Sequence, residues 1–83
     1  MTTVRIRYFA SIREALGPGE ALSTGAATLG ALRDELIARG GAHAEALARG
    51  RAVRLALDQV MADESAALRE GAEVAFFPPV TGG

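Results

Sequence analysis

The chain of 83 residues contains neither cysteine nor lysine. Without cysteine it cannot form a disulfide, use a thiol nucleophile, or hold zinc or an iron–sulfur cluster through thiolates. The same absence fits a cytoplasmic protein, which is the location we expect. All nine basic residues are arginine, so the N-terminus is the only aliphatic amine. An Ala- and Arg-rich genomic composition and selection against lysine both account for this bias, and we favour the first. The chemical consequence is the same: a reactive acyl group on this chain meets no lysine or cysteine of its own.

Further classes of function are excluded by patterns that the sequence does not have. Acidic and basic residues are interleaved and give a net charge of −1, so no basic stripe predicts nucleic-acid binding. No apolar run approaches the length of a membrane span, and the N-terminus has the pattern of a strand and not of a signal peptide. No Gly-rich phosphate loop is present. The single histidine, His43, has no second ligand beside it and is predicted to lie on the surface, so we expect no bound metal or cofactor.

The length allows one domain with a modest core, and it makes a large enclosed active site improbable on size alone. The first strand is predicted by a period of two in residues 4–9. Its core side consists of Val4, Ile6 and Tyr8. Phe9 falls on the other side, together with the arginines.

Residues 29–39 have the spacing of an amphipathic helix, with Thr28 as its N-cap and Gly40-Gly41 as its stop. The apolar side of this helix is formed by Leu29, Leu32, Leu36 and Ile37. The charged side is predicted to be solvated, and it consists of Arg33, Asp34, Glu35 and Arg39. Glu35 and Arg39 are four residues apart and are predicted to form an ion pair.

Shorter elements fill the rest of the chain. They are helical turns at 11–16 capped by Ser11, a weak strand at 20–24, a helical turn at 42–49, a strand at 53–57, a turn at Asp58-Gln59 and a short strand at 60–62. The final strand places Val74 and Phe76 in the core and Phe77 outside. This order suits an α+β sheet with one main covering helix. If the first and last strands are parallel neighbours, Phe9 and Phe77 emerge on one open face and form a docking patch.

The C-terminal end runs from this final strand into a segment that cannot pack. Pro78 and Pro79 fix φ and lack N–H donors, so they end the strand and direct the chain away from the body. An extended arm over 78–83 reaches about 20 Å at roughly 3.3 Å per residue, and its Gly82-Gly83 tip is narrow. We therefore predict a domain at 1–77 and a tail at 78–83. The tail residues before the terminal glycine are Pro78, Pro79, Val80, Thr81 and Gly82.

The last ten residues, VAFFPPVTGG, resemble the C-terminal signature of the MoaD-type, ubiquitin-like sulfur carrier family, the small subunits of molybdopterin synthase. A Gly-Gly end alone would be weak evidence for this family, because other ubiquitin-like carriers share it. The Phe-Phe-Pro-Pro sequence before it resembles the carriers of molybdenum-cofactor synthesis. Weaker similarity extends over the whole chain, through Tyr8-Phe9-Ala10, Arg13-Glu14, the helix at 28–37 and Asp58-Gln59.

The resemblance implies a β-grasp fold and a chain that is not an enzyme on its own. It implies that a separate E1-like activating enzyme adenylates the Gly83 carboxylate with ATP, after which the adenylate becomes a thiocarboxylate. It further implies that the sulfur passes to cyclic pyranopterin monophosphate inside the large synthase subunit, in a heterotetramer. The residues that match the family's docking surface for both partners are Phe9, Met61 and Phe77.

Several alternatives share the Gly-Gly end. A sulfur carrier for thiamine, tungsten-pterin or tRNA thiolation is the nearest of them, and Pro78-Pro79 favours the molybdopterin reading over it. A ubiquitin-like modifier that conjugates to target lysines belongs to a different class. An inert β-grasp interaction module with a disordered tail is the third possibility.

Overall fold

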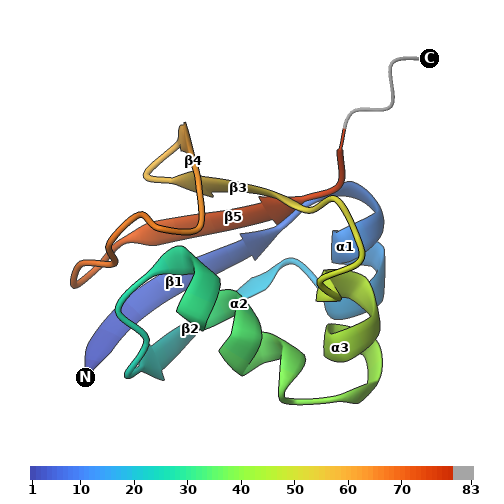
Figure 1. The fold of residues 1–83 in the computed structure, drawn as a ribbon, viewed down its shortest axis with the longest axis horizontal. Helices are drawn as coiled ribbons and strands as arrows, with labels where there is room; N and C mark the ends of the chain where they lie inside the picture. Colours follow the sequence, from blue (N-terminus) through green and yellow to red (C-terminus); the bar gives the residue numbers. More distant parts are fainter. Residues whose placement is uncertain (80–83) are drawn as a thin grey trace.

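The computed structural model describes residues 1–79 of the chain. In this part five strands form one mixed sheet in the order β2-β1-β5-β3-β4, and the helices lie on one side of it (Figure 1). The elements are β1 (Thr2–Tyr8), α1 (Ala10–Leu16), β2 (Gly19–Thr24), α2 (Leu29–Ile37), α3 (Gly41–Leu47), β3 (Arg54–Leu57), β4 (Val60–Ala62) and β5 (Glu73–Phe77). The predicted α+β sheet with one main covering helix is therefore present, with α2 as the longest helix.

The first and last strands lie side by side and parallel at the centre of the sheet, as the sequence predicted. Ile6 pairs with Val74 and Tyr8 with Phe76. β2 runs antiparallel to β1 on one side, and β3 runs antiparallel to β5 on the other. The parallel pairing brings the end of β5, where the tail begins, beside the start of α1.

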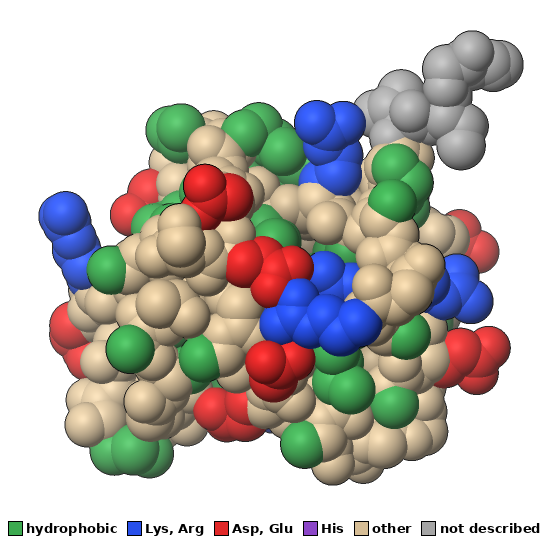
Figure 2. Space-filling model, in the orientation of Figure 1, with side chains coloured by type: hydrophobic (Ala, Val, Ile, Leu, Met, Phe, Trp, Pro, Cys, Tyr) green, Lys and Arg blue, Asp and Glu red, His purple; other side chains and the backbone are tan. Residues whose placement is uncertain are grey.

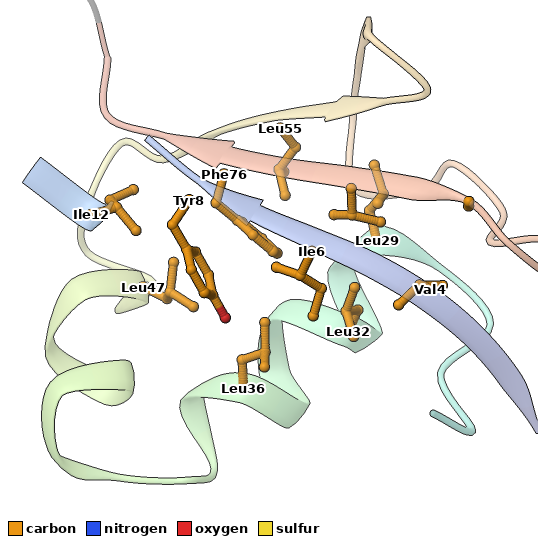
Figure 3. Close-up of a cluster of buried hydrophobic side chains, with 12 residues drawn as sticks. Val4, Ile6, Tyr8, Ile12, Leu29, Leu32, Leu36, Leu47, Leu55 and Phe76 are labelled. Carbon is orange, nitrogen blue, oxygen red and sulfur yellow. The ribbon is translucent and has the colours of Figure 1, made fainter. Parts of the chain in front are cut away.

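The core lies between this sheet and the helices (Figure 3). Its largest members carry less than 2 % of their surface exposed, and they are Tyr8, Phe76, Ile6, Leu29, Leu32, Leu36, Leu47, Val4 and Val74. The rings of Tyr8 and Phe76 stack with centroids 6.1 Å apart. The period-two and helical patterns thus selected the correct core faces of β1, α2 and β5.

Helix α2 begins where the sequence predicted. Thr28 is its N-cap, and the Thr28 hydroxyl accepts a hydrogen bond of 3.2 Å from the Ala31 N–H. The helix is followed by Gly40 and Gly41, which have φ of 76° and 55° and take a left-handed backbone that glycine adopts without strain. Among residues 1–79, no helix combines the length and the apolar character needed to cross a membrane.

Arg33 departs from its prediction, because it is buried and only 3 % exposed. Its guanidinium donates to the carbonyls of Leu47, Ala48 and Arg51 at 2.8, 2.7 and 3.1 Å. It also lies 3.0 Å from the carboxylate of Glu64. The carbonyls at the end of α3 have no partner inside their own helix, and Arg33 satisfies them. The prediction of a solvated charged side is therefore wrong at this residue.

The predicted Glu35–Arg39 pair is also wrong. Arg39 donates two hydrogen bonds of 2.8 Å to Glu20 on β2, and Glu35 instead accepts from the buried hydroxyl of Thr24. A two-pronged contact with one carboxylate is stronger than a single contact along a helix, so the partner from the neighbouring strand is preferred.

Helix α1 starts one residue earlier than predicted, and Ser11 is not its cap. The N-cap is Phe9, which makes no side-chain capping bond. Its carbonyl accepts from the N–H groups of Ile12 and Arg13 at 3.1 and 3.2 Å. The N–H of Phe9 donates to the Phe76 carbonyl at 3.1 Å, which extends the central strand pairing by one residue.

Candidate docking face

The sheet face opposite the helices carries no covering element in the described part of the chain, and strand register decides which residues lie there. Arg7 pairs with Ala75 across β1 and β5, and Ala75 pairs with Ala56 across β5 and β3. Ala56 in turn pairs with Met61 on β4. Directly paired residues point to the same side of a sheet, so these four form one row across the open face.

Two alanines form the floor of this face. Ala75 lies on the outward side, yet only 8 % of it is exposed, and Ala56 is only 6 % exposed. Their short side chains lie below the longer ones of the surrounding strands. The open face is therefore shallow at its centre and raised at its margins.

Phe9 and Phe77 form the aromatic part of the face. Their ring centroids are 6.1 Å apart and their planes are 83° apart, which is an edge-to-face arrangement. Phe9 is 36 % exposed and Phe77 is half-buried. The prediction that both rings emerge together at the root of the tail is confirmed.

Met61, the third predicted contact residue, lies on the same face and is 53 % exposed. It follows the turn at Asp58 and Gln59, whose φ values of 50° and 70° close the β3–β4 hairpin where the sequence predicted a turn. Strand β4 is two positions from β5, so Met61 is about 10 Å from the line of Phe77 across the sheet. The three residues share one face, and their binding role stays a prediction.

The root of the tail is described as far as Pro79. Pro78 is half-buried and Pro79 is exposed. Both line a shallow pocket of about 190 Å³ beside Ile12 and Val53. The predicted tail residues Val80, Thr81, Gly82 and Gly83 lie outside the described residues.

Two carboxylates have a lowered pKa because arginines donate hydrogen bonds to them. Hydrogen bonds from Arg39 lower the pKa of Glu20, and hydrogen bonds from Arg49 lower the pKa of Glu64. Figure 2 shows basic side chains surrounded by acidic ones in the region between α2 and α3. These pairs hold helices and loops together.

The sequence did not predict the surroundings of the Tyr8 hydroxyl or of the His43 ring. Burial raises the pKa of Tyr8 from 10.0 to about 12, and its hydroxyl has no hydrogen-bond partner within residues 1–79. His43, predicted to lie on the surface, is half-buried, and its ring meets the Tyr8 ring at a centroid distance of 6.3 Å. No group of three or more metal-binding side chains occurs in the described part of the chain.

The sheet order, the parallel central pair and helix α2 packed across one side of the sheet define a ubiquitin-like β-grasp protein. The chain belongs to the ThiS family, which matches residues 6–83.

Two curated relatives match nearly the whole chain. The molybdopterin synthase sulfur carrier subunit of Haemophilus influenzae is 37 % identical over 81 residues, covering 96 % of this chain and 99 % of the relative. The protein of the same name from Escherichia coli is 36 % identical, with the same coverage. The resemblance drawn from the C-terminal residues is thus confirmed at the level of the family.

Solved structures share the fold over its full length. SAMP1 from Haloferax volcanii is 27 % identical with a TM-score of 0.75, and the match covers 98 % of this chain and 99 % of SAMP1. A complex of subunits 1 and 2 of the molybdopterin-converting factor from Helicobacter pylori contains a chain that is 26 % identical, with a TM-score of 0.70. That match covers 99 % of this chain and all of the other. The β-grasp prediction is confirmed.

Proposed function

We propose that this chain is the sulfur carrier subunit of a molybdopterin synthase. The observation that carries the proposal is the Phe9–Phe77 pair, which forms an exposed aromatic patch at the root of a Gly-Gly tail. An exposed aromatic pair on an uncovered sheet face is suited to docking another protein. Both curated relatives carry the name of this subunit, which supports the same assignment.

The chemistry would take place at the carboxylate of Gly83. A carboxylate is a poor acyl donor until one of its oxygens becomes part of a good leaving group. Attack of this oxygen on the α-phosphate of ATP, in a separate E1-like activating enzyme, gives an acyl adenylate and releases pyrophosphate. A sulfur donor at the oxidation level of sulfide then displaces AMP and leaves a thiocarboxylate. The sequence contains no Gly-rich phosphate loop, so the activating enzyme would bind the ATP.

The chain would contribute delivery, and its partner would contribute catalysis. Phe9, Met61 and Phe77 would dock on the large subunit, and Pro78-Pro79 would direct the tail into that subunit's active site. There the sulfur would pass to cyclic pyranopterin monophosphate, and Gly83 would return to a carboxylate. The Helicobacter pylori structure is a complex of two such subunits, which supports a large-subunit partner for this chain.

A protein modifier is the second candidate. A Haloferax volcanii structure that is 25 % identical, with a TM-score of 0.76, is described as small archaeal modifier protein 1. A modifier would form an isopeptide bond between Gly83 and a lysine of another protein. A carrier for thiamine, tungsten-pterin or tRNA thiolation would form the same thiocarboxylate and differ only in the acceptor of the sulfur.

A reconstituted assay separates these functions. The thiocarboxylated protein is mixed with the large synthase subunit and cyclic pyranopterin monophosphate, and dithiolene product is measured. The proposal expects product in proportion to the thiocarboxylate consumed. A thiocarboxylate that forms but yields no pterin product would assign the chain to another sulfur pathway. Isopeptide adducts in a lysate supplied with ATP would assign it to the modifiers.

A further inference from the structure

We propose that the docking face binds a carboxylate-rich surface of the large subunit through Arg7 and Arg54, which flank its apolar centre. This inference rests on the proposed function, because the partner is the one assigned above. It adds the chemical character of the partner's surface, namely acidic side chains arranged around an apolar site.

Strand register places the two arginines on opposite sides of β5. Arg7 on β1 is paired with Ala75, and Arg54 on β3 is paired with Phe77. Both side chains are exposed. They lie on strands two positions apart, so about 10 Å of sheet separates them, and Ala75 and Phe77 lie between.

Among residues 1–79, three of the nine arginines have a carboxylate within 4.0 Å, and the six others, Arg7 and Arg54 among them, have none. On the helix side, Arg33, Arg39 and Arg49 each lie within 3.0 Å of a carboxylate. Within residues 1–79, no carboxylate lies within 4.0 Å of the guanidinium of Arg7 or Arg54. The open face therefore keeps positive charge that the fold has not neutralised.

The guanidinium of Arg7 is also held in place. It lies 5.5 Å from the centroid of the Phe9 ring, at the range of a cation–π contact. Phe9 in turn meets Phe77 edge to face. A charge that is already positioned beside the apolar patch loses less conformational entropy when a partner binds it.

Two further arginines lie beside Arg7. Arg5, two residues before Arg7 on β1, pairs in register with Glu73, but within residues 1–79 no carboxylate lies within 4.0 Å of its guanidinium. Arg5, Arg7 and Arg13 line one groove of about 460 Å³, together with Gly19 and Glu73. Glu20 lines the same groove, but it already accepts two hydrogen bonds from Arg39.

This arrangement determines what the partner must supply. Covering Arg7 and Arg54 with an apolar surface would remove their hydration without replacement, which is costly. Carboxylates opposite them would replace it. Because the whole chain has a net charge of −1, an acidic partner would also be guided onto this face in preference to the acidic parts of the surface.

The test is a titration of the full-length chain with the large subunit at increasing salt concentration. We expect Arg7→Glu and Arg54→Glu each to weaken the affinity about tenfold and to flatten its salt dependence. The matched control is Arg69→Glu, which makes the same charge change at an exposed residue before β5, at the end away from the tail. Its affinity is expected to stay within about twofold of the parent. Arg7→Gln, which removes the charge without reversing it, is expected to give an intermediate loss.

The outcomes distinguish the inference from the function. If the affinity for the large subunit does not depend on salt and is equal for Arg7→Glu, Arg54→Glu and Arg69→Glu, the proposal of an acidic partner surface is wrong. The proposed function as a sulfur carrier would be unaffected by that result. Absence of any complex with the unaltered chain would overturn both. Self-association of the unaltered chain, lost in Arg7→Glu and Arg54→Glu, would assign the face to a second copy and overturn the inference. Thermal unfolding of each variant shows whether the fold is retained.

Discussion

Phe76 and Phe77 are neighbours in sequence, but they lie on opposite faces of the sheet. Phe76 has no exposed surface and stacks on Tyr8 in the core, whereas Phe77 is half-buried and meets Phe9 on the open face. One residue therefore stabilises the fold, and the next is available to a partner. The two residues form an internal control for each other.

We expect Phe76→Ala to lower the free energy of unfolding by about 3–5 kcal/mol, because it opens a cavity in the core of a small domain. Phe77→Ala is expected to cost the fold little and to weaken binding to the large subunit about thirtyfold. Denaturant unfolding and titration measure the two quantities. If Phe77→Ala unfolds the chain while Phe76→Ala leaves it stable, the strand register is wrong by one residue.

Arg33 is predicted to be the charged side chain on which the fold depends most. Arg33→Met removes the donors to Leu47, Ala48 and Arg51 and leaves Glu64 without this partner. We expect a loss of about 3 kcal/mol in the free energy of unfolding, because buried carbonyls lose their hydrogen bonds. Denaturant unfolding measures it.

Arg69→Met is the matched control for this change, since Arg69 is exposed. Its cost is expected to stay within about 0.5 kcal/mol, as for most surface substitutions. Equal stability of the two variants would mean that Arg33 is not satisfying buried carbonyls.

The hydroxyl of Tyr8 should be dispensable at neutral pH. It is buried and has no hydrogen-bond partner in the described part of the chain. We expect Tyr8→Phe to change the free energy of unfolding by less than about 1 kcal/mol, or to raise it. A large loss of stability at neutral pH would show that the hydroxyl has a partner in solution.

The same residue makes stability depend on alkaline pH. The fold raises the pKa of Tyr8 from 10.0 to about 12, so the unfolded chain gives up the Tyr8 proton more readily. The Tyr8 contribution is therefore complete below pH 10.0 and is lost as the pH rises through about 12. Tyr8 is the only tyrosine, so tyrosinate absorbance reports it directly, and Tyr8→Phe should lose less stability in this range. Titration of the folded chain with an ordinary tyrosine pKa would contradict this account.

The sequence was sufficient to predict the strands and helix faces that follow from a local repeat of apolar residues. It did not reveal side-chain contacts between residues far apart in the chain. Alternation in residues 4–9 and the Val74–Phe76 spacing were sufficient to place β1 and β5, and their parallel pairing brought Phe9 to Phe77. The partners of Arg33 are carbonyls near the end of α3, which no helical spacing reveals. Arg39 likewise donates its hydrogen bonds to Glu20, which lies nineteen residues earlier on strand β2, and not to Glu35.

The Gly82-Gly83 tip has no side chains and suits a narrow channel in the large subunit, so bulk at this tip should affect sulfur transfer more than docking. Gly82→Val adds a branched side chain where the sequence has none. We expect the variant to bind the large subunit with unchanged affinity and to lose most of its turnover in the reconstituted synthase assay. Turnover equal to that of the parent would contradict a narrow channel.

The central claim is that the Gly83 carboxylate carries the sulfur, and intact mass spectrometry tests it most directly. The chain is incubated with its activating enzyme, ATP and a sulfur donor, in parallel with a chain that lacks Gly83. The account predicts that the full chain gains the mass of one oxygen replaced by sulfur, while the shortened chain stays folded and unchanged. Sulfur acquired by the shortened chain, or no mass change in the full chain under conditions that activate a known carrier, would contradict it.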